Sequence, residues 1–97
     1  MILNERETPK GPLVSVCDRS ILGKTFENGD VSITVTEDFY DGERVDEQAV
    51  VESLARAHVA NIVGVKAVSL AIEHGFVDEA HVLEIGETRH AQVLRMG

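Results

Sequence analysis

The residues best suited to chemistry are one cysteine and four histidines in a chain of 97 residues. Cys17 could act as a nucleophile if His58 or His90 served as its base. Asn61 would then orient that histidine, as in other thiol–base–orienter groups. The spacing matches no cysteine-hydrolase signature, and free cysteines are among the most buried residues. We therefore expect Cys17 to be a small buried hydrophobe at the end of a strand.

Metal and cofactor chemistry have little support in the sequence. The four histidines (His58, His74, His81 and His90) have no paired cysteine, and no two of them lie four residues apart on a helix. His74 is placed to end a helix, where a cation is favoured. No phosphate-loop or dinucleotide-binding glycine pattern occurs. We expect no metal site and no cofactor.

An anion site is the next candidate. If a helix begins at Asn61, the N–H groups of residues 62–64 point outward, and Gly64 lets a phosphate or carboxylate approach. Lys66 would add positive charge. The alternative, which we favour, is that Gly64 only allows two helices to pack closely or kink.

The segment Phe39-Tyr40-Asp41-Gly42-Glu43 predicts a turn. One interpretation puts Phe39 in the core and bonds the Tyr40 hydroxyl to the backbone. The other exposes Tyr40 beside Glu43, Arg44 and Lys24 as part of a recognition surface, because loops often carry function.

The last predicted strand is basic in an otherwise acidic chain. It holds Arg89, His90, Gln92 and Arg95, with no acid after Glu87. On a strand Arg89 and Arg95 share one face, while His90 and Gln92 share the other. RNA or an acidic partner would suit this strand. A solvated edge whose charges discourage aggregation suits it equally well.

Composition limits the classes of function. Apolar residues make up 43% of the chain and charged residues 27%, as in folded soluble proteins. The net charge of −8 repels phosphate backbones, so general DNA binding is not expected. Because the sequence shows no export signal and no apolar run long enough for a bilayer, we expect a cytoplasmic protein without a membrane partner.

The expected elements follow from local patterns. Asp18 is placed to cap a single turn that runs through Leu22 and ends at Gly23. Asn28-Gly29 suits a tight hairpin, and Gly75 with Phe76 suits a Schellman helix end. The patterns predict a strand over 13–17, hairpins over 24–36 and 81–96, and helices over 46–58 and 61–74.

These elements predict a single α+β domain over residues 1–97. We expect an antiparallel or mixed sheet of four to five strands, with two main helices on one face. Residues 1–12 form a polar leader, either flexible or an edge strand. An exposed edge strand would also offer a surface for a homodimer.

Five short groups of residues occur in a fixed order along the chain. They are Cys17-Asp18, Leu22-Gly23-Lys24, the turn 39–43, Asn61-Ile62-Val63-Gly64 and His90-Ala91-Gln92. In this order they resemble the archaeal domain of unknown function 424 family. The resemblance runs from about Leu13 to Met96 and implies an archaeal cytoplasmic protein, with no activity, substrate or catalytic residue to carry over.

The leading hypothesis is a non-enzymatic binding or assembly module with a protein or RNA partner. A ribonucleoprotein or translation-associated role would rest on the basic last strand. The alternative is a small enzyme, or an anion- or ligand-binding protein, with one pocket formed by Cys17, Lys24, Asn61 and His90. The full set of candidate binding residues is Cys17, Asp18, Lys24, Tyr40, Glu43, Asn61, Lys66, Arg89, His90 and Gln92.

Overall fold

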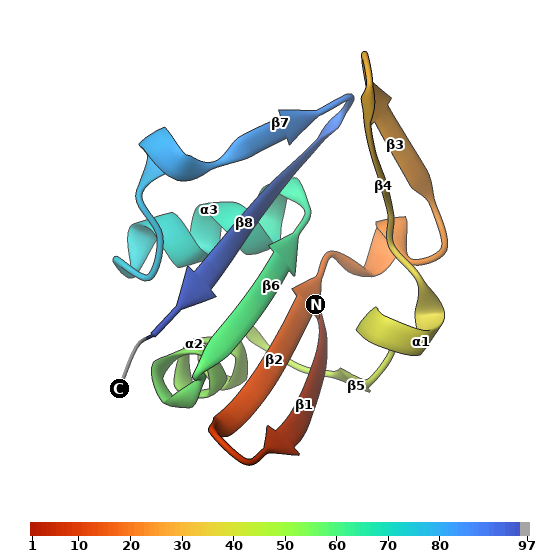
Figure 1. The fold of residues 1–97 in the computed structure, drawn as a ribbon. Helices are drawn as coiled ribbons and strands as arrows, with labels where there is room; N and C mark the ends of the chain where they lie inside the picture. The colour runs from red at the N-terminus through yellow and green to blue at the C-terminus, as the bar shows by residue number, and fades with distance from the viewer. Residues whose placement is uncertain (96–97) are drawn as a thin grey trace.

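A computed structural model of the chain describes residues 1–95, which form a small α+β domain. Six strands make one mixed sheet in the order β5-β1-β2-β6-β8-β7, and β3 and β4 form a separate hairpin (Figure 1). The strands are β1 (Ile2–Thr8), β2 (Gly11–Cys17), β3 (Thr25–Asn28), β4 (Val31–Thr34), β5 (Glu43–Arg44), β6 (Val59–Val63), β7 (Leu83–Ile85) and β8 (Thr88–Leu94). The helices are α1 (Glu37–Tyr40), α2 (Glu47–Arg56) and α3 (Val65–Glu73), and 3₁₀ turns lie at Arg19–Ile21 and Glu79–His81.

The α+β class is confirmed, whereas the expected count of four to five strands and two main helices is too low. The sheet has six strands, with a two-stranded sheet beside it, and the described residues include three α-helices. The additional strands come from segments whose sequence does not show a strand pattern. One is the polar leader, one is a two-residue strand, and one is a segment that the apolar pattern assigned to a helix.

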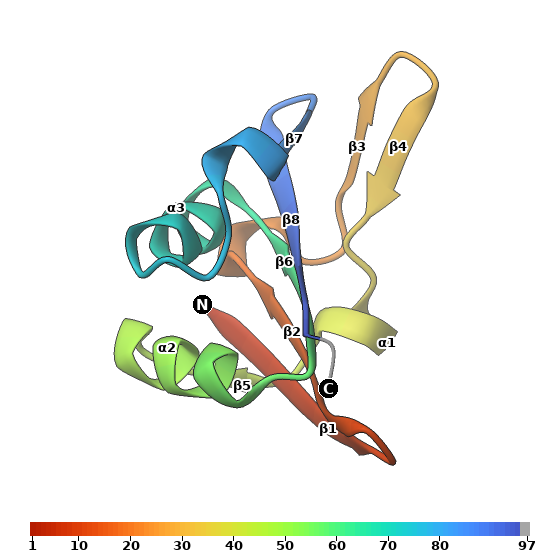
Figure 2. The same cartoon turned by 60° about the vertical axis from the view of Figure 1, so that its left-hand side comes forward.

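The sheet has one fully covered face and one partly covered face. Helices α2 and α3 lie on the same side, and α1 and the β3–β4 hairpin lie on the other (Figure 2). Under the two longer helices, alternate residues of β2, β6 and β8 point into the main core. A smaller core under α1 contains Ile2, Cys17, Val35, Tyr40 and Val63.

The centre of the sheet is the parallel pair β2 and β6, in which Val16 is opposite Ile62 and Cys17 is opposite Val63. The expected helix from Asn61 to His74 is therefore wrong in its first part. Residues 59–63 are a strand, and α3 begins only at Val65. Val59–Val63 is apolar except for Asn61, and periodicity does not separate so short an apolar run from part of a buried helix.

Local capping and turn patterns are mostly confirmed. The Asp46 carboxylate accepts a hydrogen bond from the Ala49 N–H at the start of α2. At the end of α3, Gly75 has φ +76°, and Phe76 N–H donates to Ala71 as in a Schellman motif. The first hairpin turns one residue later than expected: Gly29 and Asp30 are its loop residues, and only Gly29 has positive φ.

The polar leader forms β1, which pairs with β2 from Ile2–Cys17 to Thr8–Gly11. On its other side only Ile2 and Leu3 are paired, through the short strand β5. Beyond Leu3, β1 therefore forms an edge of the sheet, and its charged side chains face solvent there.

The approach of β5 to β1 depends on Gly42. A Cβ atom at this position would lie 2.1 Å from the Leu3 carbonyl oxygen. We predict that Gly42→Ala destabilises the protein by about 2 kcal/mol or more, because backbone must move to relieve the clash. Chemical denaturation measures this, with Gly75→Ala as the control.

In the control, the new Cβ meets no atom within 4 Å. The cost of Gly75→Ala then comes only from its positive φ and should be about 1 kcal/mol. Equal losses in the two variants would contradict the close approach of β5 to β1.

Candidate functional site

Asp18 lies directly after β2, and its carboxylate caps a helix far away in sequence. One carboxylate oxygen accepts a hydrogen bond from Lys66 N–H at 3.0 Å, and the other accepts from Ala67 N–H at 2.8 Å. The side chain makes no capping bond to the 3₁₀ turn at 19–21 that follows it. The expected role of Asp18 in that turn is therefore wrong, because the nearby N-terminus of α3 takes the carboxylate instead.

The Asp18 carboxylate occupies the space that a side chain at position 64 would fill. Gly64 has φ +118°, and a Cβ atom there would lie 2.4 Å from the Asp18 Cγ atom. The anion site expected at Asn61–Gly64 is not formed as predicted, because residues 61–63 belong to β6 and the first N–H groups of α3 already bind Asp18. The preferred alternative, two helices meeting at Gly64, is wrong for the same reason.

Lys66 lies beside this cap and is exposed. It lines a hollow of about 450 Å³ together with Met1, Asp18, Arg19 and Ser20. Both oxygens of the one carboxylate in this hollow are used by the helix cap. Arg19 and Lys66, both exposed, are the positively charged residues that line this hollow.

Cys17 is fully buried, and burial raises the pKa of its thiol to about 11, with a further contribution from neighbouring Asp18. The thiol is thus protonated at neutral pH and shielded from solvent, as expected for a small buried hydrophobe. His90 is not its base. Val63 lies between Cys17 and His90 in the sheet, and two strand spacings amount to roughly 10 Å.

The predicted pocket of Cys17, Lys24, Asn61 and His90 does not form in the structure. Asn61, His90 and Cys17 lie on the same face of the sheet, but Cys17 is buried in the part of that face that the smaller core covers. Lys24 is exposed on the chain between the first 3₁₀ turn and β3. None of the described hollows is lined by two or more of these four residues.

Tyr40 is the buried aromatic of the 39–43 segment, with 5% of its surface exposed, and burial raises its pKa to about 12. Of the two interpretations of this segment, the one that exposes Tyr40 as part of a recognition surface is wrong. The segment is a short helix followed by β5, so Tyr40 points into the smaller core. Phe39 is half-buried instead, edge-on to Tyr40 at 5.0 Å, with the Arg6 guanidinium 5.6 Å from its ring centre.

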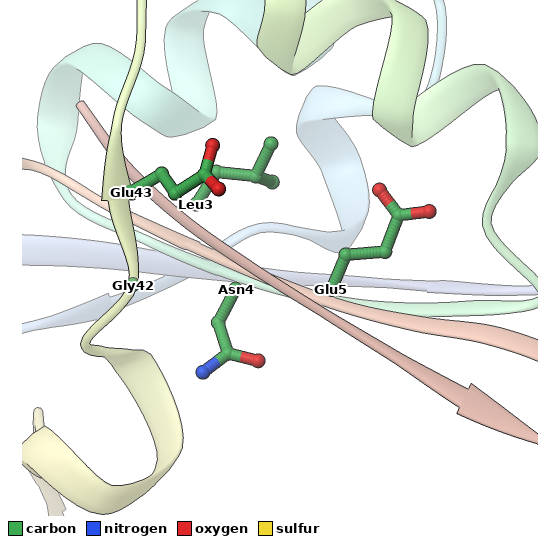
Figure 3. A pocket seen from close by; sticks show the side chains of 5 residues that line it. All are labelled: Leu3, Asn4, Glu5, Gly42 and Glu43. Atoms are coloured by element: carbon green, nitrogen blue, oxygen red, sulfur yellow. The ribbon is translucent and has the colours of Figure 1, made fainter.

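Glu43 lies at the β5–β1 crossing, where Leu3, Asn4, Glu5 and Gly42 also line a hollow of about 330 Å³ (Figure 3). The side chains of Leu3, Glu5 and Glu43 point to one side of β1, and Asn4 points to the other. Glu5 is already bound by the Ser53 hydroxyl at 2.9 Å. Asn4 donates to the Asp41 carbonyl. This hollow therefore contains structural contacts between β1 and its neighbours.

Arg89 in β8 and Arg95 directly after it both bind other residues of the fold. Arg89 pairs with Glu79 at 3.4 Å, with its side chain 20% exposed. Arg95 donates to the carbonyls of Ala55 and Ala57, at and beside the C-terminal end of α2. Both point to the helix-covered side, as their strand parity predicted. Their engagement weakens the observation on which an RNA-binding role was based.

The partly covered face carries an exposed area that we name the open patch. It consists of two rows of residues across β2, β6 and β8. His90, which is half-buried, lies beside them. The Asn61 side chain accepts a hydrogen bond from the Gln92 amide at 2.9 Å. The polar row is Ser15, Asn61 and Gln92, of which Ser15 is buried, and the apolar row is Leu13, Val59 and Leu94.

Gln92, Asn61 and His90 were identified from the sequence, whereas Leu13, Val59 and Leu94 were not. Alternation alone places all of them on one face once the pairing of β2, β6 and β8 is known. Leu94 is 68% exposed and Leu83 of β7 is 57% exposed. Beside them lies a hollow of about 340 Å³ lined by His81, Leu83, His90, Ala91, Gln92 and Leu94. Burial lowers the pKa of His90, which favours its neutral form.

Two further classes of site find no support in residues 1–95. No group of three His, Cys, Asp or Glu side chains there is arranged to hold a metal ion. No helix in this part of the chain has both the length and the apolar composition needed to cross a bilayer.

The fold and these contacts define a small α+β domain with a helix-capping aspartate at the centre of its sheet. The family described as "Protein of unknown function (DUF424)" matches residues 5–96, and the chain belongs to this family. A crystal structure of an uncharacterized conserved protein from Methanopyrus kandleri has the same fold, with a TM-score of 0.76 and 21% identity. The match covers 99% of this chain and 94% of that one. No curated protein matches the chain.

We predict that Asp18→Ala destabilises the protein by about 2 kcal/mol, because two N–H groups at a buried helix start lose their acceptor. The matched control is Asp46→Ala, which removes one exposed capping bond and should cost about 1 kcal/mol. Urea unfolding gives both values, and amide exchange should rise at residues 66 and 67 only in the Asp18 variant. Similar losses would contradict a special role for Asp18.

The buried Cys17 thiol should not react with iodoacetamide at pH 7.5 in the folded protein. Its raised pKa leaves little thiolate, and burial blocks access. In denaturant the same thiol should react at the rate of a free cysteine. Intact-mass measurement follows both reactions, and rapid single labelling of the folded chain would restore the nucleophile hypothesis.

Proposed function

We propose that this protein is a non-enzymatic binding or assembly module that contacts another protein through the open patch. The observation that carries the proposal is the absence of charge from this surface. On β2, β6 and β8 the partly covered face has no Asp, Glu, Lys or Arg, although 27% of the chain is charged. The centres of protein interfaces are depleted in charge in the same way.

The composition of the patch favours a protein partner. Leu13, Val59 and Leu94 offer apolar contact, and the Asn61 and Gln92 amides offer donors and acceptors beside it. Neutral His90 adds one more donor and acceptor. The two rows contain neither a cation for phosphate nor an aromatic ring for base stacking, which single-stranded nucleic acids generally require.

The same features argue against catalysis at this surface. The thiol of Cys17 is buried in the smaller core and is protonated, and the histidine beside the patch has no acidic partner among its contacts in residues 1–95. Catalysis requires a nucleophile and a base within hydrogen-bond reach. The patch offers shape and hydrogen bonds, which are the means of recognition.

The patch can be tested by capture from an archaeal lysate at native salt. We predict that Asn61→Lys, which places a charge at its centre, lowers recovery of the partner by about tenfold or more relative to the unchanged protein. Ser69→Lys is the matched control, because it adds the same charge at an exposed position on α3. Circular dichroism confirms that both variants fold.

Equal recovery by the three baits would contradict the proposal. Ribonuclease treatment of the lysate tests the ribonucleoprotein hypothesis in the same experiment. Loss of the captured protein after this treatment would show that RNA forms the contact. Retention would support direct binding of protein by the patch.

A further inference from the structure

Apart from the two-residue strand β5, whose Glu43 and Arg44 are both charged, the described sheet has three stretches of strand edge, and two of them are protected. The edge of β1 beyond Leu3 carries Glu5, Arg6 and Glu7. Charges of this kind are a common device against edge-to-edge pairing. At the other end of the sheet, the Asn28 side chain donates to the Glu84 carbonyl of β7 at 3.2 Å, and the β3–β4 hairpin lies beside that strand.

The third stretch is the outer edge of β8, which β7 covers only in part. β7 pairs with residues 88–90, so Ala91–Leu94 have no strand on that side. Their inner side pairs with β6. The bonds from Gly64 N–H to Arg89 O and from Arg95 N–H to His58 O show that the odd-numbered residues bond towards β6.

The even-numbered residues therefore direct their backbone groups away from β6. For Gln92 and Leu94 these are one N–H and one C=O each, which find no backbone partner within residues 1–95. The stretch Ala91–Leu94 contains no charged residue and no proline. It is thus an unprotected edge with two outward-facing residues, unlike the other two edges.

There is room for a strand beside this edge. A hollow of about 340 Å³ lies on its open-patch side, and another of about 360 Å³ lies on its helix side. His81, Gln92 and Leu94 line both hollows. In Figure 1, β7 and the 3₁₀ turn before it diverge from the lower half of β8. The two hollows therefore open on either side of the same edge.

We propose that the edge of β8 binds β8 of a second copy of this chain, antiparallel and about a two-fold axis through Val93. Gln92 of one copy is then opposite Leu94 of the other, and the reverse pair is identical. Each of the two pairs exchanges two N–H to C=O bonds, so all four free backbone groups of each copy are satisfied.

The second copy fits this edge better than an unrelated extended peptide for two reasons. The free edge is only two outward-facing residues long, and β8 itself presents a matching pair in the correct spacing. The axis also brings the two Leu94 side chains into diagonal contact on the open face, where each is 68% exposed in a single copy. The contact is small, so it predicts a weak, concentration-dependent dimer.

This inference does not rest on the proposed function, because it concerns purified protein alone. We predict that sedimentation equilibrium detects a monomer–dimer equilibrium at protein concentrations up to about 1 mM. Leu94→Lys should weaken the dimer at least about tenfold, since two lysines would then lie across the axis. Val31→Lys is the matched control, because Val31 is a strand residue of similar exposure, 51%, on the separate hairpin.

A charge swap tests the symmetry of the contact. Leu94→Lys and Leu94→Glu should each be monomeric, and their equimolar mixture should form a heterodimer. Amide exchange should slow at Gln92 and Leu94 as the concentration of the unchanged protein rises. A protein that stays monomeric at 1 mM, or a dimer that survives both Leu94 variants, would overturn the proposal.

Discussion

The carboxylate of Asp18 joins the two halves of this protein. It ends the N-terminal β-hairpin and binds the first free N–H groups of α3, 48 and 49 residues later in the chain. Helix α3 has no acidic residue in its first turn, and its N-cap is Gly64, which has no side chain to cap it. A buried helix start without an acceptor is costly, so Asp18 supplies one from another strand.

This contact accounts for the order of several elements. Because β2 and β6 are parallel, both strands finish at the same end of the sheet. The residue after β2 therefore meets the helix after β6. Gly64 then has to lack a Cβ, because the carboxylate occupies that space. The hairpin, α1, β5 and α2 lie between these two strands in sequence and are folded around them. Asp18 and Gly64, both within the segments that resemble the family, thus have a structural role that requires no ligand.

The sequence predicted those features that depend on neighbouring residues. The Asp46 cap, the Schellman motif at Gly75 and the two hairpins involve contacts within a few positions, and all occur in the structure, although the first hairpin turns one residue later than predicted. Strand β6 was missed because four of its five residues are apolar, and so short an apolar run has no alternation that separates a strand from a helix. The two residues of β5 have no pattern of their own, since pairing with β1 alone makes them a strand.

The candidate site was predicted by residue type better than by arrangement. His90, Gln92 and Asn61 were chosen from the sequence and do share one surface, whereas Cys17 and Tyr40 belong to the smaller core, where α1 covers the same face. The direction of a side chain on a strand depends on register, which only the pairing partners determine. The same alternation turns Arg89 and Arg95 towards the helices and leaves no charged residue on the opposite face of β2, β6 and β8. Because this surface offers apolar and amide contacts and its one cysteine is buried, we propose recognition rather than catalysis for it.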